Sequence, residues 1–405
     1  MKIKNIISQI GGKKAVIILT VFVDVLGIGI VIPIMPFYVE SFGVTPFFIT
    51  LLFAVFSLFA FLSAPFLGAL SDKIGRRPVL LMSIFSTAVG WFVFAGAGSI
   101  LFLFIGRIID GLAAGNFSTA QSYLVDISKD EKERTTNLGL TGAIFGVGLI
   151  IGPMLGGLLS TISPAFPFWF AGCLAIINFI GAFFFLPETH HERDAKKKIQ
   201  INPLAPIIRS VKDNSLRSRY LAWFLFAIAI AIQQSIFALY LDYQFGFTAA
   251  MVGYLLSAMG IVMVINQGIL LKRFWLKYFK ESSLEIWLFL LFAVGFILVG
   301  IGNIYILILG LLFLIFPQSI LRIVVSSSVA GIAGKEKRGE SLGVMSSVMA
   351  LGMVIAPPLA GLLFEKHHSM PFLISAFFVI LAFLVMKFYS PRAEKFVEQN
   401  PPVAF

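Results

Sequence analysis

The sequence GALSDKIGRRPVL, at residues 68–80, joins two long apolar runs, 47–70 and 79–98. Each run is long enough to form a membrane-crossing helix, which needs about 20 predominantly apolar residues. A tight turn is expected here, in which Gly75 permits a positive φ and Gly68 allows a close approach between helices. The stretch is therefore expected to be a short loop whose basic residues remain at the membrane surface.

The same alternation of apolar runs and short charged loops extends along all 405 residues. Hydrophobic residues make up 59% of the chain and charged residues 13%, which excludes an ordinary soluble domain with its roughly 25% charged residues. The pattern predicts an all-α membrane protein of twelve transmembrane helices. The expected spans are 15–38, 47–70, 79–98, 100–124, 137–160, 167–187, 219–243, 250–272, 284–302, 304–328, 340–364 and 371–390.

One long polar connection, 188–218, divides this pattern into two halves. The halves resemble each other, because Gly148, Pro153 and Gly157 recur at the same spacing as Gly352, Pro357 and Gly361. Parallel six-helix repeats are an architecture of many secondary transporters. The expected domains are an N-terminal bundle at 1–187, a basic cytoplasmic linker at 188–218, a C-terminal bundle at 219–390 and a cytoplasmic tail at 391–405, with the two bundles related by pseudo-symmetry.

The chain has a net charge of +11, and its basic residues are unevenly distributed among the loops. Nearly all of the 31 Lys and Arg residues fall in alternate loops, whereas Lys366 lies in an opposite loop and Arg107 and Arg322 lie within spans. The positive-inside rule therefore predicts that both termini are cytoplasmic. The charge is interpreted as a topology signal, and no nucleic-acid partner is expected.

At every defined position, residues 68–80 match the G-x-L-x-D-[RK]-x-G-R-[RK]-x-x-L signature, so the chain resembles the major facilitator superfamily. In that family the charged residues of this loop lock the inner ends of the two bundles together. The resemblance implies that Asp72 caps the helix that starts near Ser341 and that Arg76 pairs with Asp126. The alternative is a basic surface loop with turn glycines. The expected gate residues are Gly68, Asp72, Gly75, Arg76, Arg77 and Asp126.

The span 100–124 contains Leu103, Arg107, Asp110 and Gly111, which resemble a signature linked to proton coupling, with Asp110 in place of the usual glutamine. A charge at the bilayer centre costs about 2.5–3.5 kcal/mol on insertion scales, so Arg107 needs a partner. Asp110 follows at i+3 on the same helix face. The alternative is a static ion pair that only holds this helix in place.

The span 15–38 carries Asp24, followed by Leu26, Gly27, Pro33 and Pro36, a spacing that resembles the first helix of twelve-helix drug:proton antiporters. Burial disfavours the charged form of a carboxyl group, so a membrane-embedded carboxyl group can bind and release protons. Asp24 is the first candidate for the proton-coupling acid, with Asp110 the second. The alternative is an acid that a neighbouring helix satisfies.

The span 137–160 contains the pattern G-x-x-x-G-P-x-x-G-G, which resembles the antiporter signature of exporters in the superfamily. Small residues four apart let two helix backbones approach, and a proline permits a bend. A purely structural packing face is the alternative. The residues concerned are Gly148, Gly152, Pro153, Gly156 and Gly157.

Several polar residues within the spans are candidates to line a central substrate cavity. Interhelical hydrogen bonds, worth about 0.6 kcal/mol each, are the alternative explanation. Since no acid is expected within the spans of the second half, Arg322 needs an acid from the other half or an anionic ligand. The cavity candidates are Asn116, Gln121, Gln233, Gln234, Tyr240, Asn266, Gln318 and Arg322.

Together these features predict a monomeric, proton-coupled exporter of an amphipathic small molecule, working by alternating access in the bacterial cytoplasmic membrane. Motifs for nucleotide hydrolysis, covalent catalysis and zinc binding are absent from the sequence, so we expect no enzyme, no metal and no cofactor besides the proton gradient. Two alternatives stay open. One is a proton-coupled symporter or a carrier of a lipid, siderophore or anionic metabolite, and the other is a non-transporting receptor.

Overall fold

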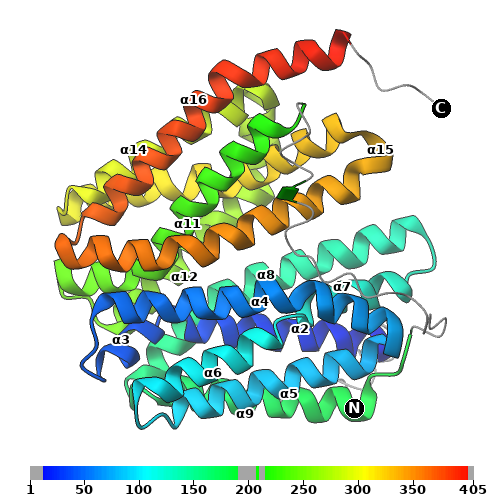
Figure 1. Ribbon diagram of the computed structural model, residues 1–405, viewed down its shortest axis with the longest axis vertical. Helices are drawn as coiled ribbons and strands as arrows, with labels where there is room; N and C mark the ends of the chain where they lie inside the picture. Colours follow the sequence, from blue (N-terminus) through cyan, green and yellow to red (C-terminus); the bar gives the residue numbers. More distant parts are fainter. Residues whose placement is uncertain (1–11, 190–206, 209–214, 400–405) are drawn as a thin grey trace. The chain divides into compact units, whose positions relative to one another are not determined.

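The computed structural model describes residues 12–189, 207–208 and 215–399. Every regular element in this part of the chain is helical (Figure 1). The elements are α2 Gly12–Val31, α3 Met35–Glu40, α4 Pro46–Ile74, α5 Arg76–Ala95, α6 Ile100–Leu112, α7 Asn116–Asp126, α8 Glu131–Ser160, α9 Phe166–Phe185, α11 Arg217–Phe245, α12 Ala249–Ile265, the π-helical η1 Asn266–Trp275, α13 Leu276–Tyr278, α14 Glu281–Gly300, α15 Ile304–Lys366 and α16 Met370–Gln399.

Within the described residues, eleven helices are long and apolar enough to cross a membrane. The expected span 100–124 is not among them, because it is interrupted between α6 and α7. The carbonyl oxygen of Gly111, at the end of α6, accepts a hydrogen bond of 3.0 Å from the Ser63 hydroxyl of α4. A neighbouring hydroxyl thus satisfies a backbone group near the interruption, as an apolar environment requires.

Among the other expected spans, 15–38 is also divided, whereas 304–328 and 340–364 lie in one long element. The span 15–38 forms α2 and α3, because Pro33 supplies no backbone donor and restricts the residue before it. In the long element α15, Gly334 adopts φ 73° and ψ 174°, which separates the apolar stretches Ile304–Gly334 and Lys337–Lys366. Glycine suits this position, since it reaches a positive φ without steric cost.

The chain divides into two compact units. Unit 1 comprises Met1–Val44, Val55–Asn202 and Phe247–Gly260, and unit 2 comprises Thr45–Ala54, Pro203–Gly246 and Ile261–Phe405. The start of α4 therefore belongs to unit 2, and most of α12 belongs to unit 1.

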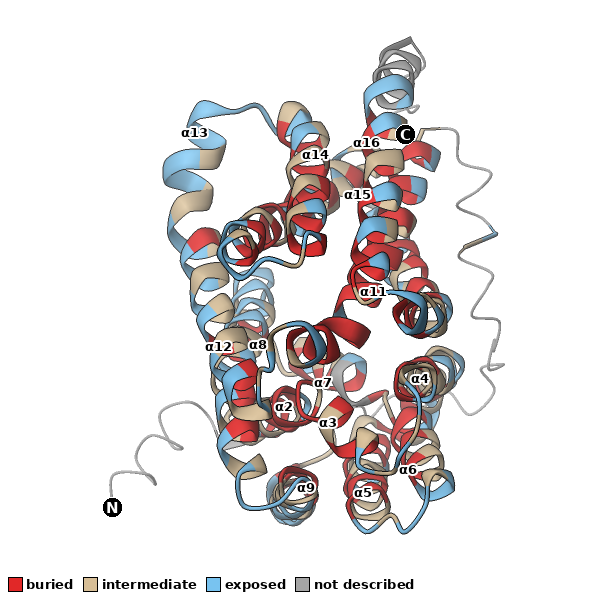
Figure 2. Ribbon diagram, turned by 90° about the vertical axis from the view of Figure 1, so that its left-hand side faces the viewer, coloured by how far each residue is buried: buried red, intermediate tan, exposed pale blue. Residues whose placement is uncertain are grey.

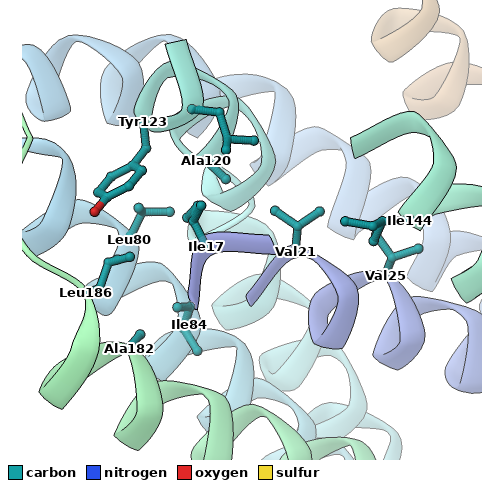
Figure 3. Packing of buried hydrophobic residues seen from close by; sticks show 11 residues of the cluster. Ile17, Val21, Val25, Leu80, Ile84, Ala120, Tyr123, Ile144, Ala182 and Leu186 are labelled. Carbon is teal, nitrogen blue, oxygen red and sulfur yellow. The ribbon is translucent and has the colours of Figure 1, made fainter. Parts of the chain in front are cut away.

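In unit 1, apolar side chains from several helices form one buried cluster (Figure 3). Ile17, Val21 and Val25 recur every four residues along one face of α2, which is the periodicity of an amphipathic helix. Leu80 on α5 and Tyr123 on α7 pack against the same cluster. This packing holds α2, α5 and α7 together, and these helices carry or flank the charged residues described below.

Unit 2 repeats one packing feature of unit 1. A Cβ added to Gly148 of α8 would lie 2.7 Å from Val25 of α2, and one added to Gly352 of α15 would lie 2.7 Å from Ala227 of α11. The two glycines are the repeat partners identified in the sequence. Each makes the same close approach to the long helix beside it, so the internal repeat is present in the packing.

The helices have buried residues on the faces toward neighbouring helices and exposed residues on other faces (Figure 2). Many of the exposed residues are large and apolar. Ile177 is 68% exposed, Phe184 72% and Trp287 53%. Such exposed apolar residues on helices of membrane-spanning length are expected where lipid replaces water as the solvent.

Candidate functional site

The loop 68–80 forms a helix–turn–helix with charged residues on its turn. Gly75, between α4 and α5, has φ 109°, which confirms the expected positive φ. Arg76 Nε lies 3.1 Å from Asp126 Oδ2 on α7, so the ion pair implied by the resemblance is present. Arg76 Nη1 lies 2.6 Å from Asp72 Oδ1. One guanidinium therefore bridges two carboxylates.

Other expectations about this loop have different outcomes. A Cβ on Gly68 would meet no described atom within 4 Å, so the close helix approach expected there is not found in the described chain. Arg77 donates a 2.7 Å hydrogen bond to the Phe183 carbonyl oxygen of α9. The expected contact of Asp72 with the region of Ser341 would join the two units and stays a prediction.

Glu188 is a site residue that the sequence analysis did not single out. Its Oε1 accepts a hydrogen bond of 3.0 Å from the Arg76 backbone N–H, and its Oε2 accepts one of 3.3 Å from the Arg77 N–H. The carboxylate therefore caps the N-terminus of α5, where a negative charge is favoured. Any side chain at Gly75 would collide with this carboxylate. The only signal in the sequence is an acid directly after Pro187, at the end of an apolar run.

We expect Glu188→Gln to lower the free energy of unfolding by about 1 kcal/mol, because the substitution removes the charge and one acceptor from the N-terminus of α5. Thermal unfolding of the purified protein measures the effect. Glu131→Gln, at an exposed position in the first turn of α8, is the matched control. Equal stability of the two variants would show that Glu188 does not stabilise the turn.

The pair Arg107 and Asp110 lies inside unit 1 on α6. Arg107 Nη1 and Asp110 Oδ2 are 3.3 Å apart, and the side chains are only 6% and 9% exposed. The guanidinium lies 4.4 Å from the ring centroid of Phe56 and 4.9 Å from that of Trp91. Arg107 thus has both the carboxylate expected from its i+3 spacing and two aromatic faces, which attract a cation.

Asp24 lies on α2 and is half-buried. Asn178 of α9 donates a hydrogen bond of 3.4 Å to Asp24 Oδ1 and another of 3.4 Å to the carbonyl oxygen of Thr20. Asn178 was not among the residues predicted from the sequence, where it is a lone amide within the apolar span 167–187. A neighbouring helix therefore interacts with the acid while leaving part of it accessible.

The glycines of the antiporter pattern on α8 pack against two helices within unit 1. A Cβ on Gly152 would lie 2.6 Å from the Gly29 Cα, and one on Gly156 would collide with the carbonyl oxygen of Ile30, both on α2. A Cβ on Gly157 would lie 3.0 Å from the Ala250 Cα of α12. The structure therefore gives the pattern a packing role on both sides of α8.

The cavity candidates fall into different environments. Tyr240 is fully buried and its hydroxyl donates to the Val299 carbonyl oxygen, so it belongs to the core of unit 2 and is unavailable to a ligand. Asn266 is also fully buried, and its amide nitrogen lies 2.6 Å from Ser319 Oγ. Its Oδ1 accepts a hydrogen bond of 2.8 Å from the indole N–H of Trp275. For these two residues the burial and the hydrogen bonds fit the packing interpretation.

Most of the remaining cavity candidates differ from Tyr240 and Asn266, because they are more exposed to solvent or have a side-chain atom without a hydrogen-bond partner in the described chain. Gln233 is 6% exposed, and its Oε1 has no hydrogen-bond partner in the described part of the chain. Gln234 and Arg322 are exposed, whereas Gln121 and Gln318 are half-buried. Asn116 begins α7, but its side chain lies outside the described features. Because the candidates are divided between the units, a shared cavity stays a prediction.

Unit 2 contains a buried ion pair where the sequence analysis expected no acid. Arg219 of α11 and Glu285 of α14 are 1% and 2% exposed, with Arg219 Nε 3.0 Å from Glu285 Oε1. Ser328 of α15 lies 2.8 Å from the same Nε and donates to Glu285 Oε2 at 3.2 Å. The expectation of no membrane-embedded acid in this half is wrong, because Glu285 follows the first turn of α14 and packs inward.

Apolar helices of membrane-spanning length, joined by charged turns and containing buried ion pairs, define a multi-pass integral membrane protein. The sequence pattern described as "Major Facilitator Superfamily" matches residues 17–281 and 277–404, which together cover most of the chain. The chain therefore belongs to the Major Facilitator Superfamily. It is a transporter and not an enzyme.

Curated relatives match over nearly their full length. The chain is 27% identical over 394 residues to the class E tetracycline resistance protein of Escherichia coli, covering 92% of this chain and 93% of that protein. It is 26% identical over 387 residues to the quinolone resistance protein NorA of Staphylococcus aureus, covering 95% and 98%.

Solved structures support the fold. The human organic anion transporter MFSD10 (TETRAN) matches with a TM-score of 0.70 at 24% identity, covering 92% of this chain and 98% of that one. The nucleoside transporter NupG matches with a TM-score of 0.76 at 12% identity, covering 93% and 98%. At these identities the likeness concerns the fold alone.

Proposed function

We propose that this protein exports amphipathic drugs in exchange for protons, by alternating access across the bacterial cytoplasmic membrane. The observation that carries the proposal is the buried pair of Arg107 and Asp110 on α6, which together with Asp24 places two carboxyl groups inside unit 1. The tetracycline and quinolone resistance proteins among its relatives support drugs as the substrate class.

The pair on α6 offers a way for a proton to change the charge of the site. With Asp110 ionised, the pair is neutral. A proton bound to Asp110 removes the counter-charge of Arg107, whose guanidinium remains in contact with the rings of Phe56 and Trp91. The site then carries a net positive charge, which favours a different arrangement of the surrounding helices. Intramembrane ionisable residues are often parts of such proton relays.

Asp24 is the first coupling acid in this proposal, because it is less buried than Asp110 and can exchange protons with water more readily. Its partner Asn178 is a neutral amide, which can donate to the carboxylate and accept from the protonated acid. Asp110 acts second, through its pair with Arg107.

We also propose a membrane topology and a monomeric state for the protein. Twelve spans form two six-helix bundles, 1–187 and 219–390, joined by a cytoplasmic linker at 188–218, and both termini are cytoplasmic. The protein acts as a monomer on small molecules within the lipid bilayer, and the proton gradient is its energy source. The pairs of Arg76 with Asp72 and Asp126 contribute to a cytoplasmic gate.

A carrier of anionic substrates is the second candidate. Arg322 of α15 is exposed, and the described residues form no ion pair with it. A cation in an apolar span favours a negatively charged ligand. Transport of an organic anion with no transport of either drug would support this candidate over drug export.

We expect Asp24→Asn and Asp110→Asn to abolish proton-driven transport, because an amide cannot take up and release a proton in the relevant pH range. Proteoliposomes with an imposed pH gradient, loaded with a tetracycline or a quinolone, measure drug movement and the accompanying proton flux. Drug binding by the purified variants is measured in parallel and is expected to persist.

Glu131→Gln is the control, because Glu131 is an exposed acid at the start of α8, away from the coupling site. Full gradient-driven transport by both aspartate variants would contradict the coupling assignment. Binding of drug by the wild type with no movement of drug or protons would instead favour the receptor alternative.

A further inference from the structure

Unit 2 contains a cavity of about 300 Å³ that the proposed coupling site does not use. Arg217, Tyr220, Leu221 and Phe224 of α11 form one wall. Val348 and Leu351 of α15 form the facing wall, and Ile207 contributes from the connection that precedes α11. The lining side chains are therefore apolar or aromatic except for the guanidinium of Arg217 and the hydroxyl of Tyr220. The volume of the cavity is at the lower end of the range of small-molecule sites.

The lining residues of α11 follow an order along the helix axis. Arg217, Leu221 and Phe224 are spaced at i, i+4 and i+7, which places them on one face. At 1.5 Å per residue, Phe224 lies about 10 Å beyond Arg217. Arg217 is the first residue of the apolar span Arg217–Phe245. The cation therefore lies at the membrane boundary, and the apolar lining extends from it toward the membrane interior.

Close contacts between α11 and α15 lie beside the cavity and beyond Phe224. The Trp223 indole N–H donates a hydrogen bond of 3.0 Å to the Met345 carbonyl oxygen, which ties α11 to α15. One turn beyond Phe224, a Cβ on Gly352 would lie only 2.7 Å from the Ala227 Cβ. These contacts fix α11 against α15 on both sides of the lining residues Val348 and Leu351.

The cavity wall is accessible at the charged end. Arg217 is exposed and forms no ion pair with the described residues. Leu221, one turn further along, is 46% exposed although it lines the cavity, whereas Tyr220 is 6% exposed. A ligand that enters here meets a cation first and then the aromatic and aliphatic side chains of Tyr220, Leu221 and Phe224.

We propose that this cavity binds an anionic phospholipid, with one acyl chain between α11 and α15 and the phosphate on Arg217. A phospholipid presents its groups in the same order along the membrane normal as the cavity does. Arginine binds phosphate with paired hydrogen bonds, and basic pockets between transmembrane helices on the cytoplasmic side bind anionic head groups. The positive charge of the cytoplasmic loops adds to the preference for an anionic lipid over a neutral one.

Native mass spectrometry of the purified full chain, titrated with phosphatidylglycerol, tests the proposal. We expect Arg217→Gln to weaken binding of the first lipid about tenfold, as loss of a charged hydrogen bond implies. Leu221→Trp is expected to weaken it similarly by filling the cavity. The matched controls are Lys387→Gln, an exposed cation of α16, and Leu312→Trp, a 40% exposed leucine of α15. Both should bind the lipid like the wild type.

Three further arms distinguish the possible ligands. Phosphatidylcholine should bind more weakly than phosphatidylglycerol, and inorganic phosphate should not displace the lipid. Displacement by phosphate would overturn the proposal in favour of a simple anion site, and displacement by a tetracycline would overturn it in favour of a drug site. Unchanged lipid binding by both cavity variants, with thermal unfolding like that of the wild type, would also overturn it.

Discussion

Replacing Glu285 with glutamine should lower the free energy of unfolding by about 3–5 kcal/mol, the usual cost of removing one partner from a buried ion pair. The effect is large because Arg219 and Glu285 are 1% and 2% exposed, so water cannot replace the lost charge. Ser328 contacts both side chains and would keep only part of the network. Thermal or denaturant-induced unfolding of the purified protein measures the change.

Two further variants separate the ion pair from general damage to α14. Glu281→Gln changes an exposed acid one turn earlier on the same helix and should leave stability within about 0.5 kcal/mol of the wild type. The double variant Arg219→Met/Glu285→Leu should recover most of the stability lost in Glu285→Gln, because no buried charge then lacks its partner. A Glu285→Gln protein as stable as the wild type would refute the role of this pair.

Replacing Gly156 with alanine should destabilise unit 1 by about 1–3 kcal/mol and abolish transport, because the added methyl group has no space. It would collide with the backbone carbonyl oxygen of Ile30, which cannot rotate away as a flexible side chain could. Relief of the collision requires α2 and α8 to separate, and α2 carries Asp24. The measurements are thermal unfolding and proton-driven drug transport in proteoliposomes.

Gly142→Ala is the matched control for this prediction. Gly142 lies on the same helix, and a Cβ there would meet nothing within 4 Å. Alanine also has the higher helix propensity, so this variant should be as stable as the wild type or slightly more stable. If the two alanine variants behaved alike, close packing of α8 on α2 would not explain the glycines of the antiporter pattern.

In the charged loop at 68–80, some of the observed contacts were predictable from the sequence and one was not. The expected turn allowed a positive φ at Gly75, and Gly75 has one. The family resemblance implied an ion pair between Arg76 and Asp126, and this pair is present. The capping of α5 by the Glu188 carboxylate was not predicted, because several helices separate Glu188 from Gly75 along the chain. Its role depends on where α9 ends in space.

The two buried ion pairs differ in whether the sequence could predict them. Arg107 and Asp110 are three residues apart on one helix, so their pairing followed from helical periodicity. Arg219 and Glu285 lie on different helices and near the ends of apolar runs, where charged residues are commonly solvated. Only the packing of α11, α14 and α15 brings them together with Ser328.

The sequence by itself determined that this is a helical membrane protein with a turn at Gly75 and an internal repeat. This is possible because a helix in lipid must satisfy its own backbone hydrogen bonds, so each span is encoded by a local run of apolar residues. The tertiary structure decided which polar side chains are buried, which glycines touch a neighbouring backbone, and that α6 and α7 are separate helices. Those features depend on contacts between helices that are distant along the chain, and such contacts cannot be predicted from a local apolar pattern.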